Sequence, residues 1–176
     1  SICDVATVAA AMKGVQHVFH QAAKSLVPLS LDHPEMVTTV NVMGTLTVLQ
    51  EAREAGVERV VYASSASVYG DAIQEENGIP VGAVHEGRLP APISPYAASK
   101  LSAEYLCHTW TSCYGLATTS LRYFIVYGPR QRIIASNYGL VIPKFLDMLR
   151  RGESPTIFGD GFQTRDFTHV SDVVAA

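Results

Sequence analysis

Residues 59–65 read Arg59-Val60-Val61-Tyr62-Ala63-Ser64-Ser65, an apolar run that predicts a buried β-strand up to Ser64, with serines at its carboxyl end. A second stretch, Ser94-Pro95-Tyr96-Ala97-Ala98-Ser99-Lys100, predicts the start of a helix, because serine favours the N-cap and proline the first helical position. We expect this helix to run to about Tyr114 and to stop at Gly115, and a strand to follow over residues 117–124. The order strand, helix, strand indicates a parallel sheet in an α/β fold.

The rest of the chain continues this alternation. Before residue 59 the pattern predicts a helix over 5–12, a strand over 15–20, a loop containing Pro28 and Pro34, and a long helix over 35–55 that stops at Gly56. Residues 70–95 form a long loop rich in Gly and Pro, and loops of that length are usually functional. Beyond residue 130 we expect a helix over 138–151, a short strand over 156–158, a turn at Gly159-Asp160-Gly161, and a helix starting near 171.

Composition narrows the kind of protein. The chain has 176 residues, 48% of them hydrophobic, and a net charge of −3, so we expect neither nucleic acid nor a membrane as partner. The N-terminus lacks the basic and apolar pattern of a signal peptide. Cys3, Cys107 and Cys113 lack the spacing of metal ligands, which predicts reduced cysteines, no metal site and a cytoplasmic protein.

Three side chains could carry acid–base chemistry: Ser65, Tyr96 and Lys100. Tyr96 and Lys100 are four residues apart, so they share one helix face. A free tyrosine has a pKa of roughly 10, and a neighbouring cation favours the phenolate that a base requires. A serine hydroxyl at the strand end could hydrogen-bond the reacting oxygen. Ligands bind at the carboxyl ends of strands in open α/β sheets, where both segments should meet.

Further blocks surround these residues in a characteristic order. They are Val18-Phe19-His20-Gln21-Ala22-Ala23, Asn41-Val42-Met43-Gly44-Thr45, Val68-Tyr69-Gly70, Leu121-Arg122-Tyr123-Phe124, Val126-Tyr127-Gly128-Pro129-Arg130, Val141-Ile142-Pro143-Lys144-Phe145 and Gly159-Asp160-Gly161 with Thr164-Arg165-Asp166-Phe167. With them, the chain resembles the extended short-chain dehydrogenase/reductase family, in its NAD-dependent epimerase/dehydratase branch. The resemblance implies a partial Rossmann-like domain over residues 1–128 and part of a substrate-binding segment over 129–176.

The resemblance also implies roles for individual residues. Ser65, Tyr96 and Lys100 match the catalytic triad, with Tyr96 as the base for a sugar hydroxyl while a hydride leaves the same carbon for NAD. Residues that match the NAD site, besides Tyr96 and Lys100, are Ala22, Ala23, Asn41, Ala63, Ser64, Tyr123 and Phe124. Residues that match the nucleotide-sugar site, besides Ser65, are Leu140, Val141, Thr156 and Arg165, with Arg165 as the partner of a phosphate. The family pairs its subunits through the helices near 35–55 and 95–114, which implies a homodimer.

One residue narrows the reaction. Dehydratases of this branch usually carry a glutamate two residues after the catalytic Ser or Thr, and here that position is Ser67. This favours an NAD-dependent 4-epimerase acting on a UDP-sugar through a transient 4-keto sugar; a dehydratase or a reductase is the alternative.

Two features depart from the family's pattern. No Gly-x-x-Gly-x-x-Gly turn precedes these blocks, and Ile125 replaces an asparagine that contacts substrate. We therefore expect a fragment without autonomous activity, whose first strand is an exposed sheet edge; a non-catalytic, dimerising product that does not bind NAD is the other hypothesis.

Two residues have open alternatives. His20 could touch the cofactor or be a structural partner at a buried strand end, and the second interpretation is favoured. Asn41 could bind cofactor or join the strand ends by hydrogen bonds, with neither favoured.

Overall fold

The computed structural model describes residues 1–70, 75–76, 79–80, 84–131, 140–162 and 164–176. It contains two compact units, Ser1–Arg122 and Tyr123–Ala176. This division falls earlier in the chain than the boundary expected after residue 128.

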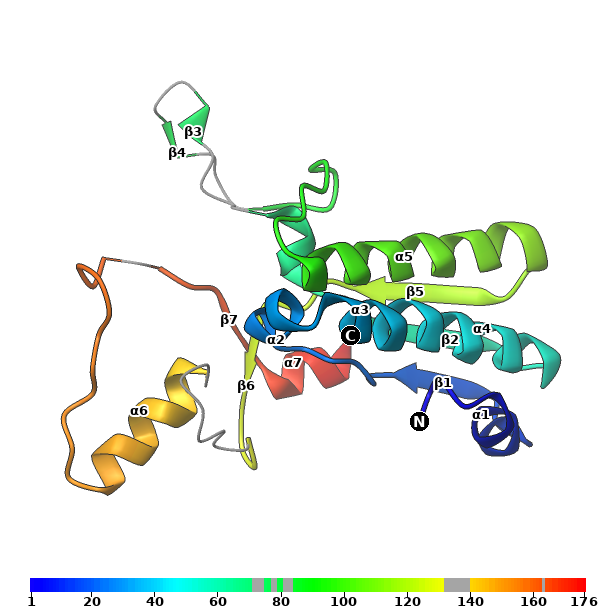
Figure 1. The fold of residues 1–176 in the computed structure, drawn as a ribbon, viewed down its shortest axis with the longest axis horizontal. Coiled ribbons are helices and arrows are strands. Elements are labelled where there is room, and N and C mark those ends of the chain that lie inside the picture. The colour runs from blue at the N-terminus through cyan, green and yellow to red at the C-terminus, as the bar shows by residue number, and fades with distance from the viewer. Residues whose placement is uncertain (71–74, 77–78, 81–83, 132–139, 163) are drawn as a thin grey trace. The chain divides into compact units, whose positions relative to one another are not determined.

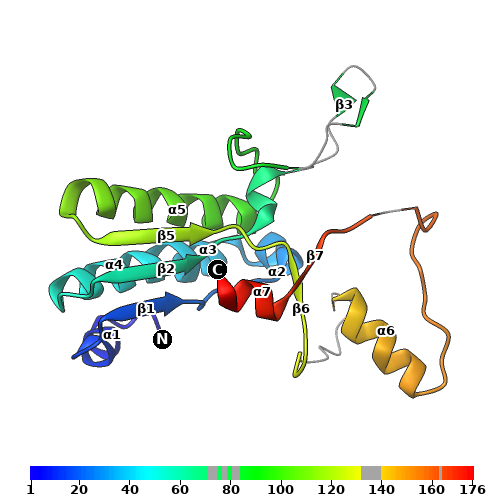
Figure 2. The same cartoon turned by 180° about the vertical axis from the view of Figure 1, so that it is seen from behind.

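The first unit is built on a parallel sheet of three strands, β1 (His17–His20), β2 (Arg59–Ala63) and β5 (Ala117–Leu121), in the order β1-β2-β5. In the register, His20 lies opposite Tyr62 and Ala63 opposite Leu121. Figure 2 shows the three strands side by side with their carboxyl ends at the same edge. The predicted α/β fold with a parallel sheet is therefore confirmed, and β1 is an edge strand among the described residues of this sheet.

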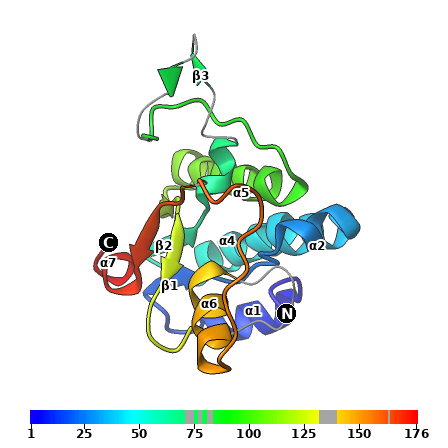
Figure 3. The same cartoon turned by 90° about the vertical axis from the view of Figure 1, so that its left-hand side faces the viewer.

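Helices α1 (Val5–Met12), α4 (Gly44–Glu54) and α5 (Pro95–Tyr114) lie along one face of this sheet (Figures 1 and 3). Side chains alternate along a strand, so Val60 and Tyr62 both point toward the helices, where they are buried. The hydrophobic core between sheet and helices contains Val8, Met12, Val48, Leu49, Ala52, Val57, Val60, Tyr62, Ala103, Cys107 and Leu116. Each fully buried aliphatic side chain there contributes about 1.5–3 kcal/mol.

Helix α5 has the boundaries that its sequence predicts. The hydroxyl oxygen of Ser94 accepts the Ala97 amide at 3.1 Å, and Pro95 occupies the first turn, where no amide proton is needed. Gly115 ends the helix with φ of 74°, a left-handed conformation that favours glycine. This start places Tyr96 and Lys100 in the first two turns, beside the carboxyl end of β2.

The helix expected over residues 35–55 has a more complex structure. It consists of α3 (Pro34–Thr38), a π-helical segment (Thr39–Met43) and α4, so one extra residue is inserted before Gly44. Helix α2 (Val27–Asp32) precedes it in a segment expected to be a loop. Pro28 suggested the loop, but proline is tolerated in the first helical turn, which is where it lies.

The second unit contains β6 (Ile125–Tyr127) paired in parallel with β7 (Phe167–His169), and helices α6 (Val141–Arg150) and α7 (Val170–Ala175). The short strand expected over 156–158 was wrong: these residues form no strand, and Ile157 and Phe158 are exposed. No described strand lies beside Thr156, Ile157 and Phe158, so an extended backbone there gains no pairing hydrogen bonds. The strand expected over 117–124 ends at Leu121.

Two short strands, β3 (Glu75–Glu76) and β4 (Ile79–Pro80), pair antiparallel within the long loop expected over residues 70–95. Parts of that loop, and the first residues of the helix expected over 138–151, lie outside the described residues.

Candidate active site

The three predicted catalytic residues gather at the carboxyl end of β2. Ser65 follows this strand and caps a 3₁₀ turn, Ala66–Tyr69, by accepting the amide of Ser67 at 3.2 Å. Tyr96 and Lys100 approach from the start of α5. The structure thus brings together a hydroxyl, a phenol and an ammonium from two separate elements, at the sheet edge where α/β proteins bind ligands.

Tyr96 is largely buried, and two effects on its pKa oppose one another. Burial raises the pKa of the phenol because it penalises the charged form, and a hydrogen bond with Ser65 acts in the opposite direction. The sequence suggested that Lys100 would lower the pKa of Tyr96, and in this structure burial prevails instead. The Ser65 hydroxyl also accepts a hydrogen bond from Ser67 Oγ at 2.9 Å, so Ser65 is held from a second side.

The ammonium of Lys100 is held against β2. Its Nζ donates to the carbonyl oxygen of Ala63 at 2.7 Å and lies 5.0 Å from the centre of the Tyr62 ring. Burial lowers the pKa of Lys100 to about 8 because the charged form is desolvated. The residue is 4% exposed, so this cation is fixed inside the protein beside the strand end.

Asn41 lies in the π-helical segment and connects three parts of the unit. Its Oδ1 accepts the Lys24 amide at 2.8 Å, and its Nδ2 donates to the Lys24 carbonyl at 3.1 Å and to Ser99 Oγ at 2.9 Å. Ser99 in turn donates to the carbonyl of Tyr96 at 2.7 Å. The carboxamide therefore ties the segment after β1 to the helix turn that carries Tyr96, and π-helical insertions are frequent at functional sites.

Four other expected cofactor residues lie at or after the same strand ends. Ala22 and Ala23 follow β1, while Ala63 ends β2 and supplies the carbonyl that Lys100 binds. Ser64 comes next, and its hydroxyl donates to Glu104 in a short hydrogen bond.

Glu104 and Arg122 lie at the site, although the sequence patterns assigned neither of them a role there. Arg122 makes three hydrogen bonds to Glu104: Nε donates to Oε1 at 3.0 Å and to Oε2 at 3.2 Å, and Nη2 donates to Oε2 at 2.7 Å. Its guanidinium lies 4.7 Å from the centre of the Tyr69 ring. Both carboxylate and guanidinium are largely buried, with side-chain exposures of 10% and 21%. The spacing Tyr96, Lys100, Glu104 could have revealed Glu104, because residues four apart share a helix face.

The remaining expected site residues belong to the second unit. Leu140 precedes α6 and Val141 begins it, while Thr156 and Arg165 lie in exposed segments outside helices and strands. Arg165 Nη1 donates to the neighbouring Thr164 carbonyl at 2.7 Å. Tyr123 and Phe124 come just before β6.

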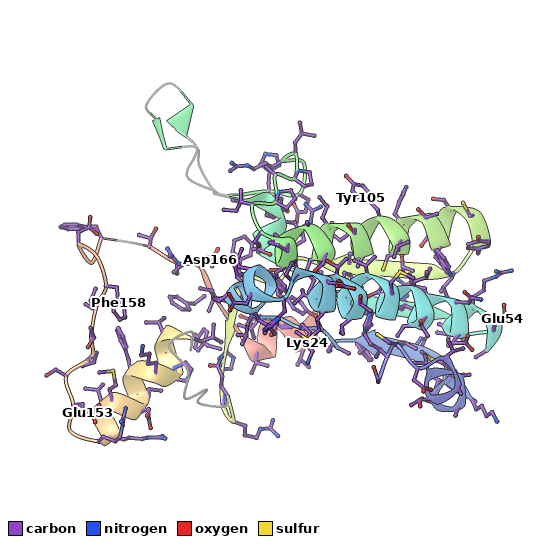
Figure 4. All side chains as sticks on the ribbon, in the orientation of Figure 1. Lys24, Glu54, Tyr105, Glu153, Phe158 and Asp166 are labelled. Carbon is purple, nitrogen blue, oxygen red and sulfur yellow. The ribbon has the colours of Figure 1, made fainter. Side chains whose placement is uncertain are left out.

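The segment after Thr156 approaches α6, where Lys144 Nζ lies 5.5 Å from the centre of the Phe158 ring (Figure 4). A hollow of about 560 Å³ in this unit is lined by residues that include Arg130, Ile142 and His169; none of the four expected nucleotide-sugar residues of this unit lines it.

His20 is a structural partner of the sheet and α4. Its Nε2 lies 2.8 Å from Thr45 Oγ1, and its ring centre is 5.4 Å from that of Tyr62. Burial, together with the charge of Lys100, lowers the pKa of His20 to about 4. These contacts support the structural interpretation of this residue.

The lowered pKa of His20 has a consequence for acid stability. The folded state holds His20 neutral, so its stabilising contribution is complete above pH 6.5 and is lost as the pH falls from 6.5 to about 4. We expect His20→Gln to reduce the loss of unfolding free energy over this range by about 3 kcal/mol. Urea titrations at several pH values measure how the free energy of unfolding depends on pH. The control His17→Gln, at an exposed position of the same strand, should keep the pH dependence of the parent protein. An unchanged pH dependence in His20→Gln would contradict the expectation.

The described part of the chain contains no cluster of three or more His, Cys, Asp or Glu side chains that could hold a metal ion. None of its helices combines the length and apolar character that crossing a bilayer would require.

The parallel sheet, with Ser65, Tyr96 and Lys100 at its carboxyl edge, defines a Rossmann-like α/β protein. A family model described as "NAD dependent epimerase/dehydratase family" matches residues 1–176. The chain belongs to this family.

Individual relatives agree with this assignment. The chain is 39% identical over 165 residues to a putative UDP-glucose 4-epimerase of Methanocaldococcus jannaschii. The matched region covers 93% of this chain and 51% of the relative. Among solved structures, it resembles UDP-glucose 4-epimerase of Thermotoga maritima with UDP-glucose, with a TM-score of 0.89, 34% identity, and coverage of 99% and 55%. It also resembles a dTDP-glucose 4,6-dehydratase of Streptomyces venezuelae, with a TM-score of 0.85, 34% identity, and coverage of 99% and 51%. The chain thus spans about half the length of the relatives it matches.

Proposed function

We propose that this chain carries the catalytic centre of an NAD-dependent 4-epimerase of nucleotide sugars, with a UDP-sugar as substrate. The observation that carries the proposal is the meeting of Ser65, Tyr96 and Lys100 at one sheet edge, with Tyr96 hydrogen-bonded to Ser65 and Lys100 buried one helix turn away. Relatives described as UDP-sugar 4-epimerases support the choice of substrate class.

Each of the three residues has a role in this reaction. Tyr96 accepts the proton of the sugar C4 hydroxyl and later returns it, and Ser65 hydrogen-bonds the same oxygen. Since burial raises the pKa of Tyr96, its base form needs a nearby positive charge, which Lys100 supplies. NAD, when bound, supplies the acceptor that takes the C4 hydride and gives it back to the other face of the sugar.

The residues present fit part of a nicotinamide site. The Lys100 ammonium has three N–H donors and uses one on Ala63, which leaves donors for ribose hydroxyls. Ala22 and Ala23 follow β1 at the same sheet edge and have small side chains that allow a flat ring to approach. We also propose that Asn41, Ala63, Ser64, Tyr123 and Phe124 contribute to this site. For Asn41 and Ser64, the hydrogen bonds to protein groups favour a supporting role.

The residue two positions after Ser65 favours epimerisation over dehydration. Loss of water from the sugar needs an acid close to the substrate, and Ser67 presents a hydroxyl there, bonded to Ser65. A serine hydroxyl is a far weaker acid than a carboxyl group. The similarity to a dTDP-glucose 4,6-dehydratase keeps dehydration as the second candidate, so the reaction product decides between them.

For the nucleotide part of the substrate we propose Leu140, Val141, Thr156 and Arg165, with Arg165 paired to a phosphate. Arg165 is exposed and forms no ion pair with a described carboxylate, so its guanidinium is available to an anion. Ile125, in strand β6, offers an apolar side chain where an amide would be expected, which points to substrate contacts different from those of relatives with asparagine.

Titration calorimetry with NAD tests whether this is a catalytic protein. In a protein that contains residues 1–176, the proposal predicts binding at micromolar strength, followed by conversion of UDP-glucose to UDP-galactose. Absence of heat at millimolar NAD would instead favour a non-catalytic protein. A 4-keto-6-deoxy sugar as the product would favour the dehydratase.

We further propose a homodimer through the helices near 35–55 and 95–114. Met36, Met43 and Tyr105 are apolar and exposed on these helices, and Tyr105 projects from α5 away from the sheet (Figure 4). Apolar exposure of this kind is typical of a protein interface. Light scattering that gives a dimer mass would support the proposal, and a monomer mass at high protein concentration would contradict it.

A further inference from the structure

The Lys100 ammonium is buried without a carboxylate partner among the described residues. No described carboxylate pairs with Lys100, because Glu104, the nearest acid along its helix, is bonded to Ser64 and Arg122. Among the described residues, the Lys100 ammonium donates a hydrogen bond to the neutral carbonyl of Ala63. A single neutral acceptor offsets little of the cost of burying an ammonium.

The Tyr62 ring provides the missing contact. Lys100 Nζ lies 5.0 Å from the centre of this ring, within the range at which an ammonium is attracted to an aromatic face. Tyr62 is 1% exposed, so water competes little with that attraction. Burial raises the pKa of Tyr62 far above its usual range, which keeps the ring neutral and its face intact at any working pH.

The hydroxyl of Tyr62 does not explain why this residue is present. It is buried and has no hydrogen-bond partner in the structure. A buried hydroxyl without a partner costs free energy. The aromatic ring, and not the hydroxyl, is therefore the part of Tyr62 with a function in this place.

The ring is also held in position. His20 packs against it at 5.4 Å between ring centres, and His20 is itself fixed by Thr45 at 2.8 Å. The titratable groups around the ammonium are thus His20 from β1, Tyr62 from β2, and Tyr96 and Glu104 from α5. Of these, His20 is neutral at pH 7, because its pKa lies near 4.

We propose that Tyr62 is a positioning residue: the face of its ring, backed by His20, holds the Lys100 ammonium charged and directed at the carboxyl end of β2. The consequence for catalysis rests on the proposed function. The effect of the ring on the Lys100 pKa does not rest on it, because this pKa can be measured whether or not the protein turns over substrate.

A matched pair of variants tests the proposal. Tyr62→Phe keeps the ring and removes the unpartnered hydroxyl, whereas Tyr62→Met keeps an apolar side chain and removes the ring. NMR titration of lysines labelled with ¹³C reports the Lys100 pKa, with the exposed Lys13 as internal reference. Loss of the ring should lower the Lys100 pKa by about one unit. The Phe variant should stay within a few tenths of a unit of the parent.

Three results would overturn the proposal: an unchanged Lys100 pKa in Tyr62→Met, an equal shift in both variants, or a shift to higher pKa. Should Tyr62→Met fail to fold, the unmodified chain still provides a test. The ring current of Tyr62 must displace the Lys100 side-chain signals from their random-coil positions, and undisplaced signals would contradict the proposal. In an active protein, the pH profile of kcat should move in the Met variant and not in the Phe variant. An inactive protein would count against the proposed function. The proposal that Tyr62 positions Lys100 would then be decided by the pKa measurement.

Discussion

Replacing Tyr96 with phenylalanine is expected to lower kcat for UDP-sugar epimerisation by about 1,000-fold in an active protein that contains residues 1–176. The substitution removes the phenol that is hydrogen-bonded to Ser65, and with it the group that takes and returns the C4 proton. The aromatic ring is retained, so the packing of the first turn of α5 should be preserved. NAD affinity should therefore change little, since the Ser65 and Lys100 positions are unaffected.

Steady-state kinetics and NAD calorimetry measure these two properties separately. Tyr114→Phe is the matched control, because it removes a phenol from the same helix at an exposed position away from the proposed site. We expect it to leave kcat within a factor of two of the parent, as exposed substitutions usually have small effects. Near-parent kcat in Tyr96→Phe would exclude Tyr96 as the base. A joint loss of kcat and of NAD binding would show that Tyr96 also supports the cofactor site and does not act as the base alone.

Replacing Glu104 with alanine should give the largest loss of stability, about 3 kcal/mol in the free energy of unfolding. Glu104 accepts three hydrogen bonds from Arg122 and one from Ser64, and its side chain is only 10% exposed. Its removal leaves a largely buried guanidinium without its anion, and a buried charge without a partner is strongly destabilising. The network joins α5 to the ends of β2 and β5, so this loss affects the frame of the active site.

Urea denaturation measures the free energy, and a double-mutant cycle shows its origin. Glu104→Ala with Arg122→Ala should cost less than the sum of the single changes, by at least about 1 kcal/mol, because the second substitution removes the unpaired charge. Glu54→Ala, at the exposed end of α4, should remain within about 0.5 kcal/mol of the parent. Additive effects at Glu104 and Arg122 would contradict the proposed pairing.

Local signals in the sequence predict the part of the fold that carries the site. The boundaries of α5 follow from Ser94, Pro95 and Gly115, whose conformational preferences act within one or two residues. Helix α1 matches its predicted range for the same reason, and Gly14 follows it with φ of 72°. The meeting of Ser65 and Tyr96 was also predictable, because parallel strands and the helices after them share one functional edge.

Features that depend on distant contacts could not be predicted. The π-helical insertion at Asn41 is stabilised by bonds to Lys24 and Ser99, which are 17 and 58 residues away in sequence. Strand β7 forms by pairing with β6, and neither run is long enough to indicate a strand by itself. The raised pKa of Tyr96 reflects burial, which a sequence pattern does not report. Likewise, the ring contact of Tyr62 with Lys100 appears only when β2 and α5 are packed together.

The most direct test of the proposed epimerase is the product formed from UDP-glucose and NAD in D₂O, observed by NMR. If Tyr96 handles only the hydroxyl proton and the C4 hydride is taken and returned, the product is UDP-galactose with ordinary hydrogen at C4 and no lasting accumulation of NADH. A product with deuterium bound to carbon, or a 4-keto-6-deoxy sugar, would contradict the epimerase mechanism.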